Sequence, residues 1–210
     1  YRVCSPFPVN VAAGEMSYIH SEATGSGLQS GIAGDTSAFV VTARDAYGNR
    51  IPRGGDAARL QVTATLDAPT ARDAVDGVIT EPVAGAVVYR GDVRDNEDGT
   101  YTVTYTPEVA GRYQVAVRLR SRAVVAAGTS ADAGALVLHE GSRAVSTPLV
   151  VHSLFHGPSC TAEGDGRAAS TTQTDASFVI HGRDSLGNLR NGDGEGDGAS
   201  DAFLVTLTSP

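Results

Sequence analysis

Residues 191–198 carry the residue types that could hold a calcium ion. They read Asn-Gly-Asp-Gly-Glu-Gly-Asp-Gly, so oxygen-bearing side chains on alternate residues could face one ion. A calcium loop of the EF-hand type also needs a glutamate at its twelfth position. That position is Ala202 when counted from Asn191 and Leu204 when counted from Asp193. The run therefore favours a solvated loop over a calcium site.

His152, His156 and Cys160 carry nitrogen and sulfur ligands that suit zinc, at a regular spacing. Gly157-Pro158 lies between them and interrupts the helix that would place all three on one face. The sequence also lacks a Gly-x-Ser-x-Gly elbow, a phosphate-binding loop and a zinc-protease helix. We therefore expect no catalytic residue, metal, cofactor or small-molecule substrate, and interpret the chain as a non-enzyme.

The charge balance argues against nucleic acid as a partner. The net charge is −8, and the basic residues, all of them arginine, form no cluster that outweighs its acidic neighbours. No apolar run is long enough to cross a bilayer, so we expect no direct membrane contact in this segment. Cys4 and Cys160 lie far apart and no Asn-x-Ser/Thr sequon occurs, which favours an intracellular compartment.

Short segments of alternating apolar and polar residues predict strands, because side chains in a strand point to opposite faces in turn. Turn-forming residues separate these segments, among them Tyr47-Gly48-Asn49, Gly54-Gly55 and Asn96-Glu97-Asp98-Gly99. Many short strands without a helical pattern predict an all-β sandwich. The four inward rows are Phe39, Val41 and Ala43; Leu60, Val62, Ala64 and Leu66; Tyr101, Val103 and Tyr105; and Tyr113, Val115, Val117 and Leu119.

The chain repeats itself. Residues 38–49 match residues 177–188 at a constant offset of 139, with Phe, Arg-Asp and Gly-Asn coinciding. Gly25 and Gly27 match Gly164 and Gly166 at the same offset. A second match, at an offset of 142, joins residues 5–9 to residues 147–151, because the linker that follows differs by three residues.

These matches predict tandem repeats, and a chain that opens at Tyr1 is expected to be an internal segment of a longer protein. We expect the last strand of a preceding repeat, a linker, one complete repeat, a second linker and the N-terminal part of a following repeat. Their boundaries are 1–11, 12–20, 21–151, 152–158 and 159–210.

Motifs at several separate places resemble the filamin (ABP280) repeat family. The resemblance covers nearly all of residues 1–11 and 21–151, and is weaker over 159–210, where Arg167 replaces the leucine after the glycine pair. It implies seven-stranded immunoglobulin-like sandwiches in tandem, with Tyr113 as a tyrosine corner. The matching motifs are Gly-x-Gly-Leu at 25–28, Arg-Asp-Ala-x-Gly-Asn at 44–49, Gly-Gly at 54–55, Asp-Asn-x-Asp-Gly-Thr-Tyr at 95–101, Tyr-x-Pro at 105–107, Gly-x-Tyr at 111–113 and Ser-Pro-Phe at 5–7.

The resemblance also implies where partners bind and which residues maintain the fold. In this family an extended peptide adds to the groove between strands C and D, which we expect at open sheet edges. The expected binding residues are Leu60, Val62, Ala64, Leu66, Val87, Tyr89 and Val93. The expected structural residues are Phe39, Asp45, Gly48, Asn49, Asp95, Asp98, Gly99, Tyr101, Tyr105, Pro107, Gly111 and Tyr113.

Two insertions depart from typical filamin repeats, at residues 67–90 and 120–143, and are either binding loops or tolerated surface slack. Altogether we expect a non-catalytic scaffolding module of a cytoskeletal or ciliary (axonemal) assembly, located in the cytoplasm. Its partners would be other proteins of the assembly and neighbouring repeats of the same protein. The alternative is a gamete-type adhesion protein at the cell surface, with filamin-like repeats in its ectodomain.

Overall fold

A computed structural model describes most of the chain. Expectations for the first strand with Cys4, for most of both insertions and for the acidic run at 191–198 fall outside the described residues. The described residues are 9–67, 73–75, 78–80, 85–120, 135–136, 138–139, 145–167, 175–190 and 203–206.

Strands and short 3-10 turns make up the regular structure of the described residues. The elements of the central repeat are β1 (Glu22–Thr24), η1 (Ser26–Leu28), β2 (Ser30–Ile32), β3 (Ser37–Thr42), η2 (Ala57–Arg59), β4 (Leu60–Leu66), β5 (Asp73–Val75), β6 (Val78–Thr80), β7 (Val88–Asp95), β8 (Thr100–Tyr105), β9 (Gly111–Leu119), β10 (Ala135–Leu136), β11 (Leu138–His139), β12 (Val145–Ser146) and β13 (Leu149–Val151). The elements that follow are η3 (Gly157–Ser159), β14 (Thr161–Glu163), η4 (Asp165–Arg167) and β15 (Val179–His181).

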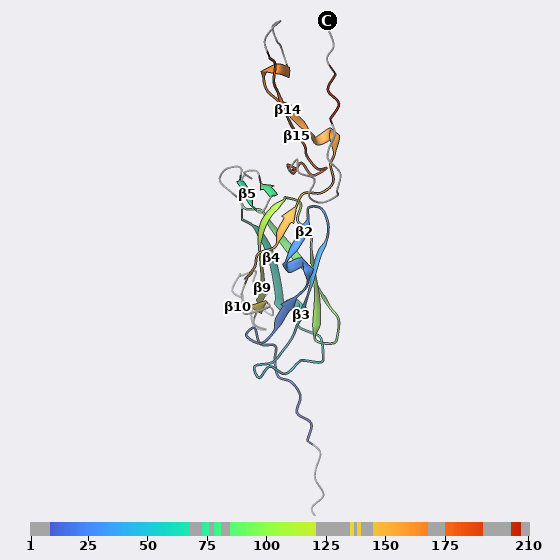
Figure 1. Cartoon of the computed structure of the whole chain (residues 1–210). Coiled ribbons are helices and arrows are strands. Elements are labelled where there is room, and N and C mark those ends of the chain that lie inside the picture. Colours follow the sequence, from blue (N-terminus) through green and yellow to red (C-terminus); the bar gives the residue numbers. More distant parts are fainter. Residues whose placement is uncertain are drawn as a thin grey trace, which may run out of the picture.

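Most strands of the central repeat form a curled sheet in the order β11-β1-β3-β8-β7-β4-β9-β13-β2, with β10 and β12 also paired to β9. Strands β5 and β6 form a separate two-stranded sheet. Its two halves face each other across one core (Figure 1). The four inward rows predicted from alternation are all buried. Ala43 is buried too, although it lies just beyond the end of β3. The seven-stranded sandwich expected from the sequence is therefore confirmed as an all-β, immunoglobulin-like arrangement.

Strand β7 joins the two halves of the sandwich. Its first half, Val88–Gly91, pairs with β4, and its second half, Asp92–Asp95, pairs with β8. Gly91 lies at the crossing, where an added Cβ would stand 2.9 Å from the Cβ of Val62 and 3.0 Å from a methyl carbon of Val103. Only glycine fits between two strands that approach so closely.

Tyrosines tie the core to the connecting segments. The Tyr113 hydroxyl donates to the Val109 carbonyl at 2.7 Å, which is the tyrosine corner that the sequence predicts. The Tyr105 hydroxyl donates to the carbonyl of Gly27, and the Tyr105 ring packs edge-on against Phe39 at 6.5 Å between centroids. Burial raises the pKa of Tyr105 to about 12 and also raises the pKa of Tyr113.

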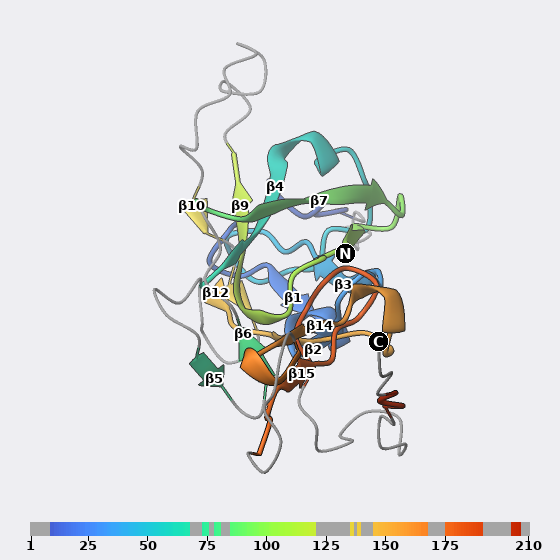
Figure 2. The ribbon, with the colours of Figure 1, turned by 90° about the horizontal axis from the view of Figure 1, so that it is seen from above.

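The chain enters the central repeat at one end and leaves it at the other. The first described residues extend from one end of the sandwich, and the chain joins it by residue 16, since Met16 is buried in the core. The β14–β15 pair lies beyond the opposite end (Figure 1). A view along the long axis shows β14 and β15 above the sandwich, close to β2 in projection (Figure 2). Strands β14 and β15 pair antiparallel, from Thr161↔His181 to Glu163↔Val179. The arrangement is linear, as in a string of modules.

Candidate functional site

The expected C–D binding edge is closed over most of its length. Strand β4 pairs with β7 from Val62 to Thr65 and with β9 along its whole length, so β4 is a central strand. The expectation that strands C and D both lie at open edges was wrong, because the first half of β7 fills the position beside β4. Of the expected binding residues, Leu60, Val62, Ala64 and Leu66 are buried, while Val87, Tyr89 and Val93 are partly buried against the core.

The hydrogen-bond register shows which backbone groups of β7 have no partner strand among the described residues. The N–H of Leu66 donates to the carbonyl of Val87 at 2.9 Å, so Tyr89 and Gly91, two and four residues further on, also face β4. Val88 and Arg90 then face the other way. Strand β8 would pair there but ends at Tyr105, opposite Gly91 in the register of this pair.

We call the N–H and C=O groups of Val88 and Arg90 the β7 outer edge. A cavity of about 360 Å³ lies beside it, and among its lining residues are Thr36, Arg90, Asp92 and Thr104–Thr106. Val88 exposes 48% of its surface, and Arg90 and Asp92 are exposed as well. The β7 outer edge therefore offers both backbone groups and polar side chains to an extended peptide.

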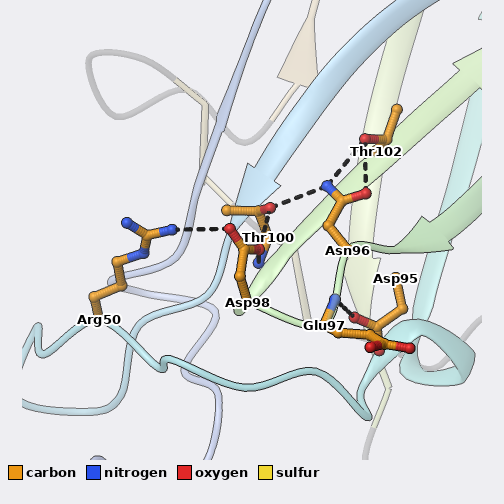
Figure 3. Close-up of polar contacts among 7 residues, drawn as sticks. All are labelled: Arg50, Asp95, Asn96, Glu97, Asp98, Thr100 and Thr102. Atoms are coloured by element: carbon orange, nitrogen blue, oxygen red, sulfur yellow. Dashed lines mark hydrogen bonds and ion pairs between the residues drawn. The ribbon is translucent and has the colours of Figure 1, made fainter.

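A polar cluster holds the turn between β7 and β8 (Figure 3). Asp95 accepts hydrogen bonds from the backbone N–H of Gly55 at 2.6 Å and of Glu97 at 2.8 Å. Asp98 accepts from both the hydroxyl and the N–H of Thr100, and these bonds, the hydroxyl first, lower the pKa of Asp98. Asn96 bonds the hydroxyls of Thr100 and Thr102, and Arg50 lies 3.4 Å from Asp98.

The predicted positive-φ turn is present at this point. Glu97 has φ 65° and Gly99 has φ 81°, both in the left-handed region. An added Cβ on Gly99 would stand 1.6 Å from the carbonyl oxygen of Ile51, so this position admits only glycine.

The turn at residues 44–50, named the Asp45 turn here, is organised by one buried carboxylate. Oδ1 of Asp45 accepts from the N–H of Tyr47 and of Asn49, both at 2.9 Å. Oδ2 accepts from the N–H of Gly14 at 3.0 Å and from the Asn49 side chain at 3.1 Å. These bonds, with that of Gly14 the strongest, lower the pKa of Asp45 to about 2. Gly14 belongs to the linker, so Asp45 also fixes where the chain enters the repeat.

The turn at residues 183–189, named the Asp184 turn here, repeats this geometry. Asp184 accepts from the N–H of Leu186 and Asn188 through Oδ1, and from the N–H of Ser153 and the Asn188 side chain through Oδ2, all at 2.9 Å. The offset of 139 found in the sequence thus relates the two turns, and it also relates Gly14 to Ser153.

The Asp184 turn contacts the central repeat directly. Oδ1 of Asn188 accepts from the N–H of Ala110 at 2.9 Å, and Nδ2 of Asn188 donates to the carbonyl of Glu108 at 2.8 Å. Leu186 lies over Gly34, whose added Cβ would stand 3.1 Å from a Leu186 methyl carbon. Sequence reasoning assigned Asn49 only a structural role and did not find this contact. Its one signal was the recurrence of Asp and Asn at the same spacing.

The remaining structural residues lie around the same turns and the core. Pro107 is fully buried, and its carbonyl accepts from the N–H of Gly34 at 2.8 Å. Gly111 opens β9 with φ 151°. Tyr101 is buried, and its hydroxyl accepts from the N–H of Asp56 at 3.2 Å.

The candidate zinc ligands are His152 and His156 in the second linker and Cys160 just after it. The His156 ring bonds the Ser159 hydroxyl at 2.8 Å, and the Cys160 thiol is a weak donor to the His156 carbonyl at 3.5 Å. Across the part of the chain that the structure describes, no three His, Cys, Asp or Glu residues gather where they could hold a metal ion. Within that same part, no helix is long and apolar enough to cross a membrane.

The fold and its turns define an immunoglobulin-like β-sandwich module arranged in series with a similar segment. Residues 17–126, just over half of the chain, match the Filamin/ABP280 repeat. The chain belongs to the filamin repeat family.

Related proteins share only part of the chain. Over 75 residues the chain is 37% identical to Filamin-C of Rattus norvegicus and to Filamin-C of Mus musculus, which is 35% of this chain and 3% of either relative. The chain therefore spans a small part of the curated relatives it matches.

Two solved structures are also similar. The Lin-41 filamin domain aligns with a TM-score of 0.40 and 14% identity, covering 65% of this chain and 97% of that domain. The Escherichia coli adhesin FdeC aligns with a TM-score of 0.41 and 18% identity, covering 84% of this chain and 44% of FdeC.

Proposed function

We propose that this chain is a non-catalytic scaffolding segment that spaces and ties together proteins of a cytoskeletal or ciliary assembly. The observation that carries the proposal is the contact between the Asp184 turn, in the segment after the sandwich, and residues 108–110 of the sandwich. Modules that are hydrogen-bonded to their neighbours keep a fixed relative orientation along a chain, whereas modules joined only by flexible linkers move independently. The filamin family is a family of structural, protein-binding repeats, which supports the same role.

The β7 outer edge is the proposed partner site within this role. An extended peptide that pairs with Val88 and Arg90 would continue the sheet where β8 ends. Alternate side chains of the peptide would meet Thr36, Thr106 and the cavity between them, which selects for short polar residues. Arg90 and Asp92 present charges of both signs, so the site favours a peptide with both an acid and a base.

Crosslinking in the native assembly tests the proposed function. The chain has no lysine, so the reagent must couple carboxylates or be photoactivated. A photoreactive residue at Val88 is expected to crosslink to another protein, whereas the same residue at Tyr18, also exposed, serves as the control. Absence of crosslinks to other proteins from every position on the repeats would count against a scaffolding role.

Two substitutions at Arg90 separate backbone from side-chain recognition. Arg90→Pro removes the outward N–H and leaves the β4 ladder intact, because Arg90 does not face β4. Arg90→Ala removes only the side chain. We expect the Val88 crosslink to be lost in Arg90→Pro and retained in Arg90→Ala. Equal crosslinking in both variants would show that the backbone edge is not used.

The cell-surface alternative remains distinguishable from this proposal. Residues of the full protein outside this segment that form a signal peptide and a membrane span would favour adhesion, while actin-binding or coiled-coil modules would favour the cytoskeleton.

A further inference from the structure

The Asp45 turn has the same groups as the Asp184 turn, but among the described residues it makes no contact equivalent to those of Asn188 and Leu186. Leu186 exposes 45% of its surface because it lies over Gly34, whereas Tyr47, at the equivalent position, exposes 90%. Asn188 is half-buried against the central repeat, whereas Asn49 is exposed. The exposed Tyr47 ring and the Oδ1 of Asn49, which has no hydrogen-bond partner among the described residues, are both available to a docking segment.

A cavity of about 410 Å³ lies at this surface. Its lining consists of Val11–Ala13 from the linker and of Asn49, Arg50, Pro52 and Arg53 from the turn and the segment after it. The linker enters the central repeat as the second linker enters the following segment, since Gly14 and Ser153 donate to equivalent carboxylate oxygens. A module attached through this linker would therefore arrive on the same side as the central repeat does at the Asp184 turn.

We infer that Tyr47, Asn49 and this cavity form the seat of the repeat that directly precedes this one in the same protein. The occupant is the turn of that repeat equivalent to residues 107–110, which offers a backbone carbonyl and an N–H like those of Glu108 and Ala110. In the docked state Oδ1 of Asn49 accepts a hydrogen bond from the N–H of that turn, and Nδ2 of Asn49 donates to its carbonyl. Asn188 bonds Ala110 and Glu108 in the same way. Tyr47 covers the small residue equivalent to Gly34.

The sequence before the seat supports this occupant. Residues 5–9 resemble residues 147–151, which precede the second linker and end in the last strand of the central repeat. The first linker is three residues longer, as the two offsets of 139 and 142 require. Three extended residues add about 10 Å of reach. The longer linker is therefore long enough for the preceding repeat to dock at the seat, but the contacts at the seat must hold it there.

A tandem chain tests the inference. Residues 1–151 are followed directly by residues 10–210, so that a complete repeat precedes Tyr47 and Asn49 of the second copy through their natural linker. Cys4 and Cys160 are replaced by serine, and Asp92→Cys in each copy carries a spin label. Double electron–electron resonance then measures the distance distribution between the two labels.

The unsubstituted tandem is expected to give one narrow distance. Tyr47→Ala together with Asn49→Ala in the second copy is expected to broaden it at least about twofold, since unlinked modules move independently by default. The same pair of substitutions in the first copy is the matched control, because no complete repeat precedes that copy, and it is expected to leave the width unchanged.

Each other result overturns the inference. A broad distribution in the unsubstituted tandem means that the seat is not occupied. A narrow distribution that survives substitution in the second copy means that other contacts fix the modules. Equal broadening from either copy means that the substitutions damage the repeat itself. Tyr47→Ala alone in the second copy separates the two explanations. Its side chain is 90% exposed, so its removal should not damage the repeat but should still broaden the distance distribution.

Discussion

Gly48 and Gly99 have the same backbone conformation in different surroundings. Their φ angles are 82° and 81°, but an added Cβ on Gly48 would meet only a His20 ring carbon at 3.9 Å, whereas on Gly99 it would overlap the Ile51 carbonyl. Both alanine variants carry the left-handed strain of about 1–2 kcal/mol. Gly99→Ala also forces the turn away from Ile51, so we expect it to lose at least about 2 kcal/mol more.

Urea unfolding of the two variants measures this difference. Because the backbone strain is shared, Gly48→Ala is the control that isolates the clash. Equal losses in free energy of unfolding would mean that the two turns do not differ as described.

Asp45 makes the free energy of unfolding of the central repeat depend on pH in the acidic range. Its pKa is held at about 2, below the ordinary value of 3.8, chiefly by the N–H of Gly14. The stabilisation is therefore complete above pH 3.8 and is lost as the pH falls through about 2. Asp45→Asn keeps the shape but not the charge, so its free energy of unfolding should fall less steeply over this range. Urea titrations at several pH values measure the slopes, and identical slopes would contradict the assignment.

At the scale of elements, the pairing of β7 with both β4 and β8 depends on Gly91, which lies where β7 crosses from one half of the sandwich to the other. Gly91→Ala would place a methyl group 2.9 Å from Val62 and 3.0 Å from Val103. We expect a loss of about 2 kcal/mol in free energy of unfolding through overpacking. Gly157→Ala is the control, since its Cβ would meet only a Phe155 ring carbon at 3.8 Å. A neutral Gly91→Ala in thermal unfolding would mean that β4 and β7 are further apart.

The pairing of β7 with β4 also marks where sequence reasoning ends. Alternation predicts the buried rows, because the identity of inward residues such as Phe39 and Val103 is local information. Glycine next to Asn or Asp likewise predicts the turns at Gly48 and Gly99. Which strand fills the position beside β4 depends on the path of the chain between them, and no pattern encodes it. The Asn188 contact was missed for the same reason, since Ala110 lies 78 residues away.

At the scale of the whole molecule, the central repeat and the segment after it differ in how many apolar side chains they bury. The central repeat encloses a core to which Met16 of the preceding segment also contributes. The described part of the following segment is a two-stranded sheet with exposed Val179 and Leu204. A two-stranded pair is marginal in water. We predict that residues 21–151 alone fold cooperatively and that residues 159–210 alone do not. Thermal unfolding followed by circular dichroism measures both, and a sharp transition in 159–210 would refute the prediction.

The most direct test of the account is the rigidity of the junction at Asn188 in the 1–210 chain. Backbone residual dipolar couplings from residues 21–67 and 85–120 report the orientation of the central repeat, and those from residues 153–167 and 175–190 report the orientation of the Asp184 turn. We predict that one alignment tensor fits both sets and that Asn188→Ala makes the two tensors differ. Asn49→Ala, which removes a bond within its own turn, should leave them equal. Two different tensors in the unsubstituted chain would contradict this prediction.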